Sequence, residues 1–329
     1  MKRLHRNLGF LAATSCLLVT AVLGATQIPP ATAQASPRES SLPGVAKVDR
    51  NVIYGMYSGL ALLMDVYHPE KPNGYGAIFI AGSAWSAPLE YGASPLKDDP
   101  GQVPAFVLPL VAAGYTIFAI DTRATPRFHY PAQIEDADRA VRFVRFHAKQ
   151  FGINPARIGA VGYSSGAHLA SLLGLMPGAG TASDRDPVQR ESARVQCVIA
   201  GGTPADLEHV GNNPAALAML SGFLGEVVPA DPASTSAVFR RLEDASPIHF
   251  VKPGVAPFLL IHGDADELVP IEAAQELEKA LQNAHVPVKL ITVKGGTHTS
   301  VVALESDEYA HEMAQWFDEY LRKPGGSGR

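Results

Sequence analysis

The chain of 329 residues is 47% hydrophobic and only 18% charged, so its composition excludes a long disordered protein. Lysine and arginine number 27 against 32 aspartates and glutamates, which gives a formal net charge of −5 without any block of like charges. Nucleic acid is therefore a poor candidate partner. The length allows two domains of about 150 residues, but α/β folds of this size also form one.

The first 35 residues have the pattern of a signal peptide that export removes. Three basic residues precede an apolar stretch at 8–25, and small residues at 31–35 offer two cleavage sites. A retained membrane anchor is the alternative, but Pro29 and Pro30 follow the apolar stretch directly. No later stretch approaches the ~20 apolar residues of a spanning helix. We therefore expect a secreted or periplasmic protein with no membrane partner after cleavage.

The rest of the chain predicts one domain with short flanks. Residues 36–49 are expected to be a linker, 50–322 a single domain and 323–329 a flexible tail. Runs at 52–57 and 61–67 suggest an antiparallel entry into a sheet. Short apolar runs follow, separated by helix-length segments, as expected for strands that are covered on both faces of a parallel sheet. These runs are 77–81, 115–120, 157–161, 195–200, 257–261 and 288–293.

The segments between these runs have helical periodicity. After Pro131, apolar residues recur three or four positions apart, and residues 271–284 and 306–321 show similar patterns. The alternation of strands and helices predicts a doubly wound α/β fold, with a mostly parallel central sheet and helices on both faces. Residues 203–250 are less regular and form a possible small cap. The apolar run at 217–220 within them is either a lid helix or plain core.

A candidate nucleophile lies in the segment Gly162-Tyr163-Ser164-Ser165-Gly166, between a predicted strand and a predicted helix. The G-x-S-x-G string alone is a weak signal, but its strand–turn–helix setting is that of a nucleophile elbow. The glycines let the turn close, and the helix adds a positive dipole end where an oxyanion forms. We predict Ser164 as the nucleophile, with a structural glycine-rich turn as the alternative.

A serine hydroxyl needs a base, and the base needs an orienting acid. In this type of fold the chain order is serine, acid, histidine. Asp264 and Asp266 follow the run at 257–261, and His298 lies in a glycine-bearing loop after the run at 288–293. Catalytic groups collect at the carboxyl ends of strands in open α/β sheets. We predict His298 as the base and Asp266, in preference to Asp264, as the acid.

Other residues compete for these roles. Asp206 is a third candidate acid, although a loop cap is its simpler interpretation. His262 is the rival base, but we expect it to fix the loop that follows its strand. His168 is expected to be a buried, hydrogen-bonded imidazole. His311 lacks the second histidine of a zinc-protease motif, and no metal site has support elsewhere in the sequence.

An oxyanion hole requires two backbone N–H groups directed at the developing charge. We expect one from Ser165, immediately after the nucleophile, and another from the loop Gly82-Ser83-Ala84-Trp85. Trp85 is expected to anchor that loop by packing rather than to bind substrate.

These residues give the chain a family resemblance. It resembles bacterial α/β-hydrolase serine esterases, in particular the feruloyl/acetylxylan-esterase-like group, which is related to hormone-sensitive-lipase-type carboxylesterases and to kynurenine formamidase. The resemblance covers roughly 50–322 and depends on residues 162–168, 262–270 and 296–298, of which His-Gly-x-x-Asp-x-x-Val-Pro is the most specific. It implies an α/β-hydrolase fold, the triad Ser164, Asp266 and His298, no cofactor, and hydrolysis of carboxylic esters.

The chain departs from this family pattern in one loop. The family reads His-Gly-Gly-x-Trp where this chain reads Ala81-Gly82-Ser83-Ala84-Trp85. The resemblance then implies that the amides of Ser83 and Ala84 are the loop donors. A side chain at position 83 restricts the torsions that glycine allows, or adds a hydroxyl donor. The loss of the histidine at position 81 removes a support of the loop.

The main hypothesis is a secreted serine esterase that forms an acyl-enzyme. Its expected substrates are small-molecule or carbohydrate-linked esters with short acyl groups of two to four carbons or a small aromatic acid. The alternatives are an exopeptidase or amidase of the prolyl-oligopeptidase or formamidase type, and a catalytically silent binding module on the same fold. The sequence leaves the oligomeric state open.

Overall fold

The computed structural model describes residues 42–323, apart from 211–212, 231–232, 234–235 and 304–306. The described residues belong to one compact unit. The expected signal peptide at 1–35, the first part of the expected linker at 36–41 and the tail at 324–329 lie outside the described residues.

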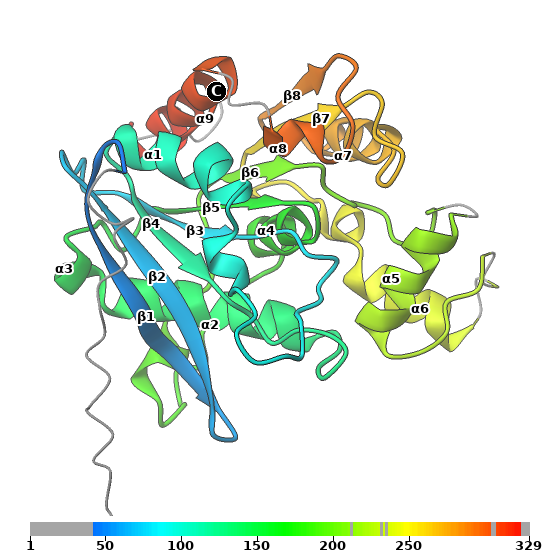
Figure 1. The fold of residues 1–329 in the computed structure, drawn as a ribbon, viewed down its shortest axis with the longest axis horizontal. Coiled ribbons are helices and arrows are strands. Elements are labelled where there is room, and N and C mark those ends of the chain that lie inside the picture. Colours follow the sequence, from blue (N-terminus) through cyan, green and yellow to red (C-terminus); the bar gives the residue numbers. More distant parts are fainter. Residues whose placement is uncertain (1–41, 211–212, 231–232, 234–235, 304–306, 324–329) are drawn as a thin grey trace, which may run out of the picture. The chain divides into compact units, whose positions relative to one another are not determined.

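The central sheet has eight strands in the order β1-β2-β4-β3-β5-β6-β7-β8 (Figure 1). β1 is antiparallel to β2, and β2 is antiparallel to β4. From β4 to β8 all neighbours are parallel, which confirms the predicted mostly parallel sheet with an antiparallel entry. The strands are β1 (Val45–Tyr57), β2 (Leu60–Pro69), β3 (Gly76–Ile80), β4 (Thr116–Ile120), β5 (Ile158–Tyr163), β6 (Val198–Gly201), β7 (Phe258–Gly263) and β8 (Val288–Val293).

The range expected for the linker, 36–49, extends too far along the chain. β1 begins at Val45, which is in register with Pro69 of β2, so residues 45–49 belong to the sheet. The serine- and proline-rich composition that suggested a linker ends before this point. The hydrogen bonds of the β1–β2 pair satisfy the backbone from Val45 onwards, which is why the strand starts there.

Helices cover both faces of the sheet. The core splits into two layers because successive strand residues face opposite sides: Ile78 and Ile80 lie in one layer and Phe79 in the other. α2, α4 and α7 pack on the first layer, and α1 and α9 on the second. The helices are α1 (Leu108–Ala112), α2 (Ala132–Phe146), α3 (Ala148–Phe151), α4 (Ser165–Leu175), α5 (Pro214–Leu224), α6 (Ala237–Ala245), α7 (Glu272–Asn283), α8 (Ser300–Ala303) and α9 (Asp307–Phe317).

The helix boundaries differ from the prediction by only a few residues. α2 begins one residue after Pro131, and α7 and α9 lie within the expected ranges. Short π-helical segments occupy Val103–Val107 and Asp318–Arg322. Within the described part of the chain, no helix combines the length and the apolar character that crossing a membrane requires.

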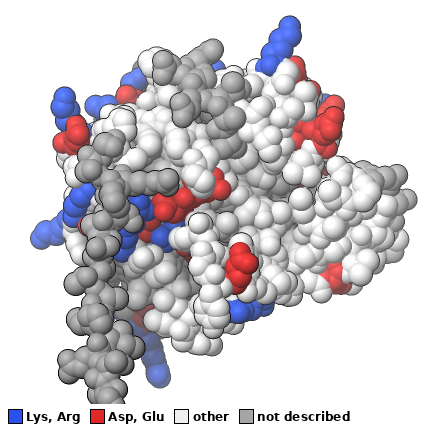
Figure 2. Space-filling model, viewed as in Figure 1, with Lys and Arg blue, Asp and Glu red and all other residues white. Residues whose placement is uncertain are grey.

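Among the described residues of the possible cap at 203–250, α5 and α6 are the α-helices, and a 3-10 helix follows at Pro247–Phe250. α5 begins at a side-chain cap from Asn213 and ends at Gly225, which has a left-handed conformation. Leu220 and Phe223 of α5 are buried, so the apolar run at 217–220 is at once a helix and part of the core. On the face seen in Figure 2, the surface over α5 and α6 carries few charged side chains.

Two glycines near helix ends, Gly174 and Gly222, differ in how closely their surroundings pack against them. A Cβ added at Gly174 in α4 would lie 2.5 Å from Val198 Cγ2, whereas one at Gly222 in α5 would have Thr125 Oγ1, at 3.9 Å, as its nearest neighbour. Both alanine substitutions gain about 1 kcal/mol of helix propensity. Gly174→Ala also overpacks the core, so we expect its free energy of unfolding to be about 1–3 kcal/mol below that of Gly222→Ala. Urea denaturation of both variants measures this difference, and equal midpoints would contradict it.

Candidate active site

The turn between β5 and α4 holds Ser164 in a strained conformation. Its φ is 52° and its ψ is −124°, a region that non-glycine residues rarely occupy. The flanking glycines make the turn possible: a Cβ at Gly162 would lie 2.4 Å from the carbonyl oxygen of Gly166, and one at Gly166 would lie 2.0 Å from that of Ile80. The backbone of Ser164 donates to Gly201 O at 2.7 Å, which ties the turn to β6.

The structure brings Ser164, His298 and Asp266 into one chain of hydrogen bonds. His298 Nε2 lies 2.9 Å from Ser164 Oγ, and His298 Nδ1 lies 2.6 Å from Asp266 Oδ2. Because an ionised carboxylate only accepts hydrogen bonds, the imidazole proton lies on Nδ1. Nε2 is then free to accept the serine hydroxyl, which is the arrangement that a base requires.

The surroundings of Asp266 keep it ionised. Burial on its own would raise the pKa of Asp266, but hydrogen bonds from His262 and His298 outweigh that effect. The amides of Leu268 and Val269 donate to Asp266 Oδ1 at 3.0 and 2.9 Å. Together they hold the pKa of Asp266 well below its usual range, so the carboxylate is available to orient His298.

The competing acids have other partners. Asp264 Oδ1 accepts the amide of Gly295 at 2.5 Å. Asp206 accepts the amide of Glu208 at 3.0 Å and lies 2.8 Å from His209 Nδ1, which agrees with its interpretation as a loop cap. In the described part of the chain, neither carboxylate contacts His298.

The two competing histidines have structural roles, as expected. His262 Nε2 donates to Val269 O at 2.8 Å and so fixes the loop that carries Asp266. His168 is fully buried: its Nε2 donates to Ala245 O at 2.8 Å and its Nδ1 accepts from Trp85 Nε1 at 3.2 Å. Burial lowers the pKa of His168 to about 4, so the ring is neutral.

The loop after β3 lies beside Ser164, the predicted nucleophile. The amide of Ser83 donates to Ser165 Oγ at 2.9 Å, while the amide of Ala84 donates to no group in the described residues. Ala84 and Trp85 have positive φ angles of 53° and 56°, whereas Ser83 does not. The restricted backbone torsions that we expected at position 83 are therefore found at Ala84 and Trp85 instead. The amide of Ser165 opens α4, where it has no intrahelical partner.

Trp85 anchors the far end of this loop. Its side chain is 7% exposed and stacks on Phe223 of α5, with ring centroids 4.2 Å apart. The Trp85 carbonyl also accepts the amide of Thr125 at 2.8 Å. The expected packing role is therefore confirmed, and Trp85 lines the cavity beside Ser164 as well.

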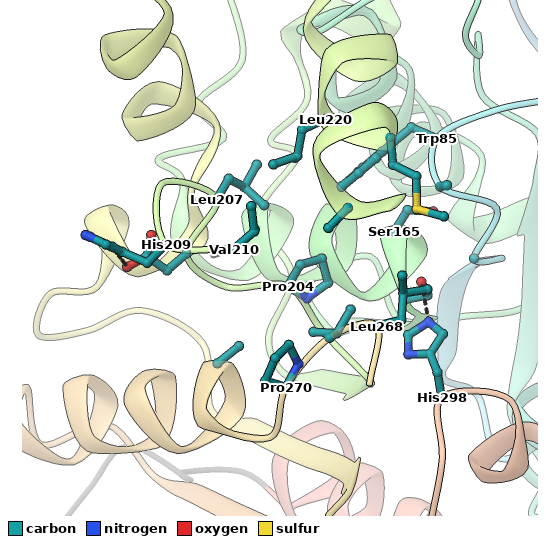
Figure 3. A pocket seen from close by; sticks show the side chains of 18 of the residues that line it. Trp85, Ser165, Pro204, Leu207, His209, Val210, Leu220, Leu268, Pro270 and His298 are labelled. Atoms are coloured by element: carbon teal, nitrogen blue, oxygen red, sulfur yellow. Dashed lines mark hydrogen bonds and ion pairs between the residues drawn. The ribbon is translucent and has the colours of Figure 1, made fainter. Parts of the chain in front are cut away.

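A cavity of about 390 Å³ extends from Ser164 and His298 towards His209 (Figure 3). Its volume lies in the range of small-molecule sites. Among the described residues that line it, none is lysine or arginine, whereas three are acidic: Asp206, Glu272 and Glu276. The wall is mainly apolar and comes from the cap, from the loop that precedes α7 and from the first turn of α7: Pro204, Leu207, Val210, Ala216, Met219, Leu220, Leu268, Val269, Pro270 and Ala273.

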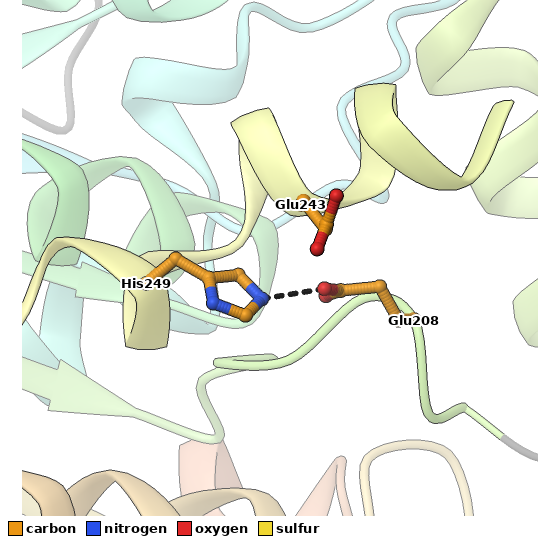
Figure 4. A group of neighbouring side chains, drawn as sticks. All are labelled: Glu208, Glu243 and His249. Carbon is orange, nitrogen blue, oxygen red and sulfur yellow. Dashed lines mark hydrogen bonds and ion pairs between the residues drawn. The ribbon is translucent and has the colours of Figure 1, made fainter. Parts of the chain in front are cut away.

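A buried polar group holds the cap segment in place. Glu208 lies close to Glu243 and His249: a carboxylate oxygen of each glutamate and a ring nitrogen of the histidine all lie within 4.8 Å of one another (Figure 4). Glu208 accepts from Ser246 Oγ at 2.5 Å, and that oxygen in turn accepts the amide of the cavity residue Leu207 at 2.9 Å. Burial raises the pKa of Glu208. These contacts could not be predicted from the sequence, because no local pattern indicates that Glu208 and His249, 41 positions apart, lie together.

The chain is similar to known carboxylic ester hydrolases. The esterase LipC of Mycobacterium tuberculosis is 30% identical over 71% of this chain and 55% of its own length. The probable carboxylic ester hydrolase LipM of the same species is 28% identical over 69% of this chain and 50% of its own length. This chain thus spans about half the length of these curated relatives. A truncated carbohydrate esterase from gut microbiota superposes with a TM-score of 0.72 and 27% identity, over 86% of this chain and 99% of that one.

Family profiles cover most of the domain. The profile described as BD-FAE matches residues 64–281, which is more than half of the chain. A second profile, described as TAP-like protein, matches residues 238–325. The BD-FAE match includes the turn at Ser164 and the loop of Asp266. The chain therefore belongs to the BD-FAE family and has the α/β-hydrolase fold that its sequence predicted.

Proposed function

We propose that the protein is a serine hydrolase that cleaves carboxylic esters through an acyl-enzyme. The observation that carries this proposal is the hydrogen-bonded chain from Ser164 through His298 to Asp266, at the end of a cavity large enough for a small ester. The similarity to LipC and LipM, whose names describe ester hydrolases, supports the same reaction.

In the proposed reaction, Ser164 Oγ attacks the ester carbonyl while His298 Nε2 takes its proton. Asp266 stabilises the resulting imidazolium, which then protonates the departing alcohol. A water molecule, deprotonated by His298, attacks the acyl-enzyme and releases the carboxylic acid. Ser164 thereby recovers its proton, and no cofactor takes part in these steps.

The proposed oxyanion hole consists of backbone amides on two sides of Ser164. Ser165 supplies one from the start of α4, and the loop after β3 supplies the others from Ser83 and Ala84. The amides of Ser165 and Ala84 are available in the free enzyme. The amide of Ser83 donates to the Ser165 hydroxyl in the free enzyme and must break this hydrogen bond before it can donate to the oxyanion. We therefore assign Ser83 a smaller contribution to the oxyanion hole than Ser165 and Ala84.

We propose small, uncharged esters as substrates. The apolar wall of the cavity favours short acyl groups or a small aromatic acid, and Met219 and Leu220 of the cap contribute to that wall. The three carboxylates and the absence of lysine and arginine among the described lining residues disfavour anionic substrates. A neutral or carbohydrate-linked alcohol fits these constraints, and one similar structure is that of a carbohydrate esterase.

We also propose that the protein is exported to the periplasm or the medium. The support is the sequence pattern of residues 1–35, with a basic start, an apolar stretch and two sites for a signal peptidase.

The identity of the nucleophile can be tested by labelling. We expect a fluorophosphonate to modify Ser164, because His298 accepts its proton. Ser164→Ala should fold normally but lose turnover of p-nitrophenyl acetate by several orders of magnitude, since removal of one member disables the whole triad. Peptide mapping and steady-state kinetics measure these outcomes. Turnover retained in Ser164→Ala would rule out the mechanism.

The choice of acid can be tested with matched amide variants. Asp266→Asn should lower kcat by about 10⁴-fold, as expected when the imidazole loses its orienting carboxylate. Asp264→Asn and Asp206→Asn remove carboxylates from the same region but should leave kcat within about threefold, because their partners lie outside the triad. Steady-state kinetics of the three variants at one pH decide the question. If Asp264→Asn or Asp206→Asn lost most of its kcat while Asp266→Asn kept most of it, Asp266 would be misassigned as the acid.

Substrate size can be tested with a series of p-nitrophenyl esters of increasing acyl length. We expect kcat/KM to be highest at two to four carbons, because the cavity has a volume of only about 390 Å³ and its lining includes the polar pair of His209 and Asp206. An acetylated sugar should be cleaved as well, whereas an aminoacyl-p-nitroanilide, which reports exopeptidase activity, should not. A maximum at ten carbons or beyond would indicate a lipase-like groove instead.

A further inference from the structure

The loop that carries the proposed oxyanion donors has no room for a side chain at its first residue. A Cβ added at Gly82 would lie 2.5 Å from Tyr163 O and 2.7 Å from Ser164 Cβ. The backbone of Gly82 is therefore in contact with the nucleophile turn itself. A shift of this residue by a few tenths of an ångström changes the position of the Ser83 and Ala84 amides relative to Ser164.

One side chain binds both backbone groups of Gly82. The amide of Gly82 donates to Gln102 Oε1 at 2.6 Å, and Gln102 Nε2 donates to Gly82 O at 3.0 Å. Gln102 is only 7% exposed, so water competes little for either hydrogen bond. A planar carboxamide that accepts and donates in this way fixes the peptide both in position and in orientation.

Gln102 is itself held by its neighbours. Its backbone amide and that of Gly101 donate to Asp99 Oδ1 at 2.8 and 3.0 Å. The amide of Val103 donates to Asp99 O at 3.0 Å, and the π-helical segment Val103–Val107 follows directly. The carboxamide of Gln102 thus projects from a rigid base towards Gly82.

The loop needs such support because it is strained. Ala84 and Trp85 have left-handed φ angles, which cost about 1–2 kcal/mol each for residues with a Cβ. Strain of this kind persists only where the surroundings fix the conformation. Trp85 is fixed by its stacking on Phe223, and Gln102 supplies the corresponding constraint at the other end of the loop.

We propose that Gln102 is a positioning residue for the oxyanion hole. By binding both peptide groups of Gly82, it holds the loop donors at the distance from Ser164 that the tetrahedral intermediate requires. This inference rests on the proposed esterase function, since it concerns the same site. Gln102 touches no reacting atom, so its loss weakens the binding of the transition state more than that of the substrate.

The first test replaces Gln102 by an apolar residue of similar length. Gln102→Met should lower kcat for p-nitrophenyl acetate about 10- to 100-fold, less than the complete loss of an oxyanion donor, with KM within about threefold. Gln133→Met is the matched control, because Gln133 is also buried, but its side chain donates to Phe128 O, in the segment before α2, and not to the loop that carries the oxyanion donors. Its kcat should stay within about twofold of the parent enzyme. Equal losses in the two variants, or an unchanged kcat in Gln102→Met, would overturn the proposal.

The second test uses a pH profile that a merely structural role would not change. In Gln102→Glu, a protonated carboxyl can accept from Gly82 N and donate to Gly82 O, as the carboxamide does, whereas the ionised form cannot donate. The ratio of its kcat to that of the parent enzyme should therefore be highest at low pH and fall as the introduced carboxyl ionises. A ratio that is independent of pH would overturn the assignment. This variant also covers the case in which Gln102→Met fails to fold.

The outcomes separate this proposal from the proposed function. If Ser164→Ala keeps its activity, the esterase mechanism is wrong and the role of Gln102 in it fails as well. If Ser164→Ala is inactive while Gln102→Met and Gln102→Glu behave like the parent enzyme, only the role of Gln102 is refuted.

Discussion

The contact between two backbone segments, the loop after β3 and the turn after β5, is the constraint on which the site depends. At this contact there is space for backbone but not for a Cβ: Gly166 lies against Ile80 O, and Gly82 lies against Tyr163 O. The parallel pairing of β3 and β5 brings these two loops to the same edge of the sheet. Ser164 and the loop amides are therefore neighbours because of the strand order, and glycine at these positions lets them approach.

The sequence predicted those parts of the structure that depend on local pattern. Apolar runs and helical periodicity gave the parallel sheet and its covering helices. The proposed triad could be chosen because each of its members follows a strand, in the order serine, acid, histidine. Asp266 was preferred over Asp264 from the sequence, and the family resemblance implies the same residue. The structure adds a physical reason, since His262 and the amides of Leu268 and Val269 fix the loop and the carboxylate that lies 2.6 Å from His298.

What the sequence did not predict depends on contacts between distant segments. Gln102 lies in a stretch without any motif, and only the fold brings its side chain to Gly82. The hydrogen bonds of Glu208 with Ser246 and His249 likewise depend on α6 returning to the loop after β6. The start of β1 was misplaced because serine and proline in the preceding residues indicated a linker, whereas pairing with β2 determines where the strand begins.

The cap has a consequence for how this protein can change over evolutionary time. Residues 203–250 supply much of the cavity wall, but none of the proposed catalytic side chains or oxyanion amides. They are tied to one another by the Glu208 and Ser246 hydrogen bonds, whereas the triad is held by loops at the ends of β5, β7 and β8. The proposed catalytic residues and the cap's part of the cavity wall are thus encoded in different stretches of the gene. In the esterase that we propose, insertions or substitutions in the cap would alter which ester is accepted and leave the proposed triad unchanged.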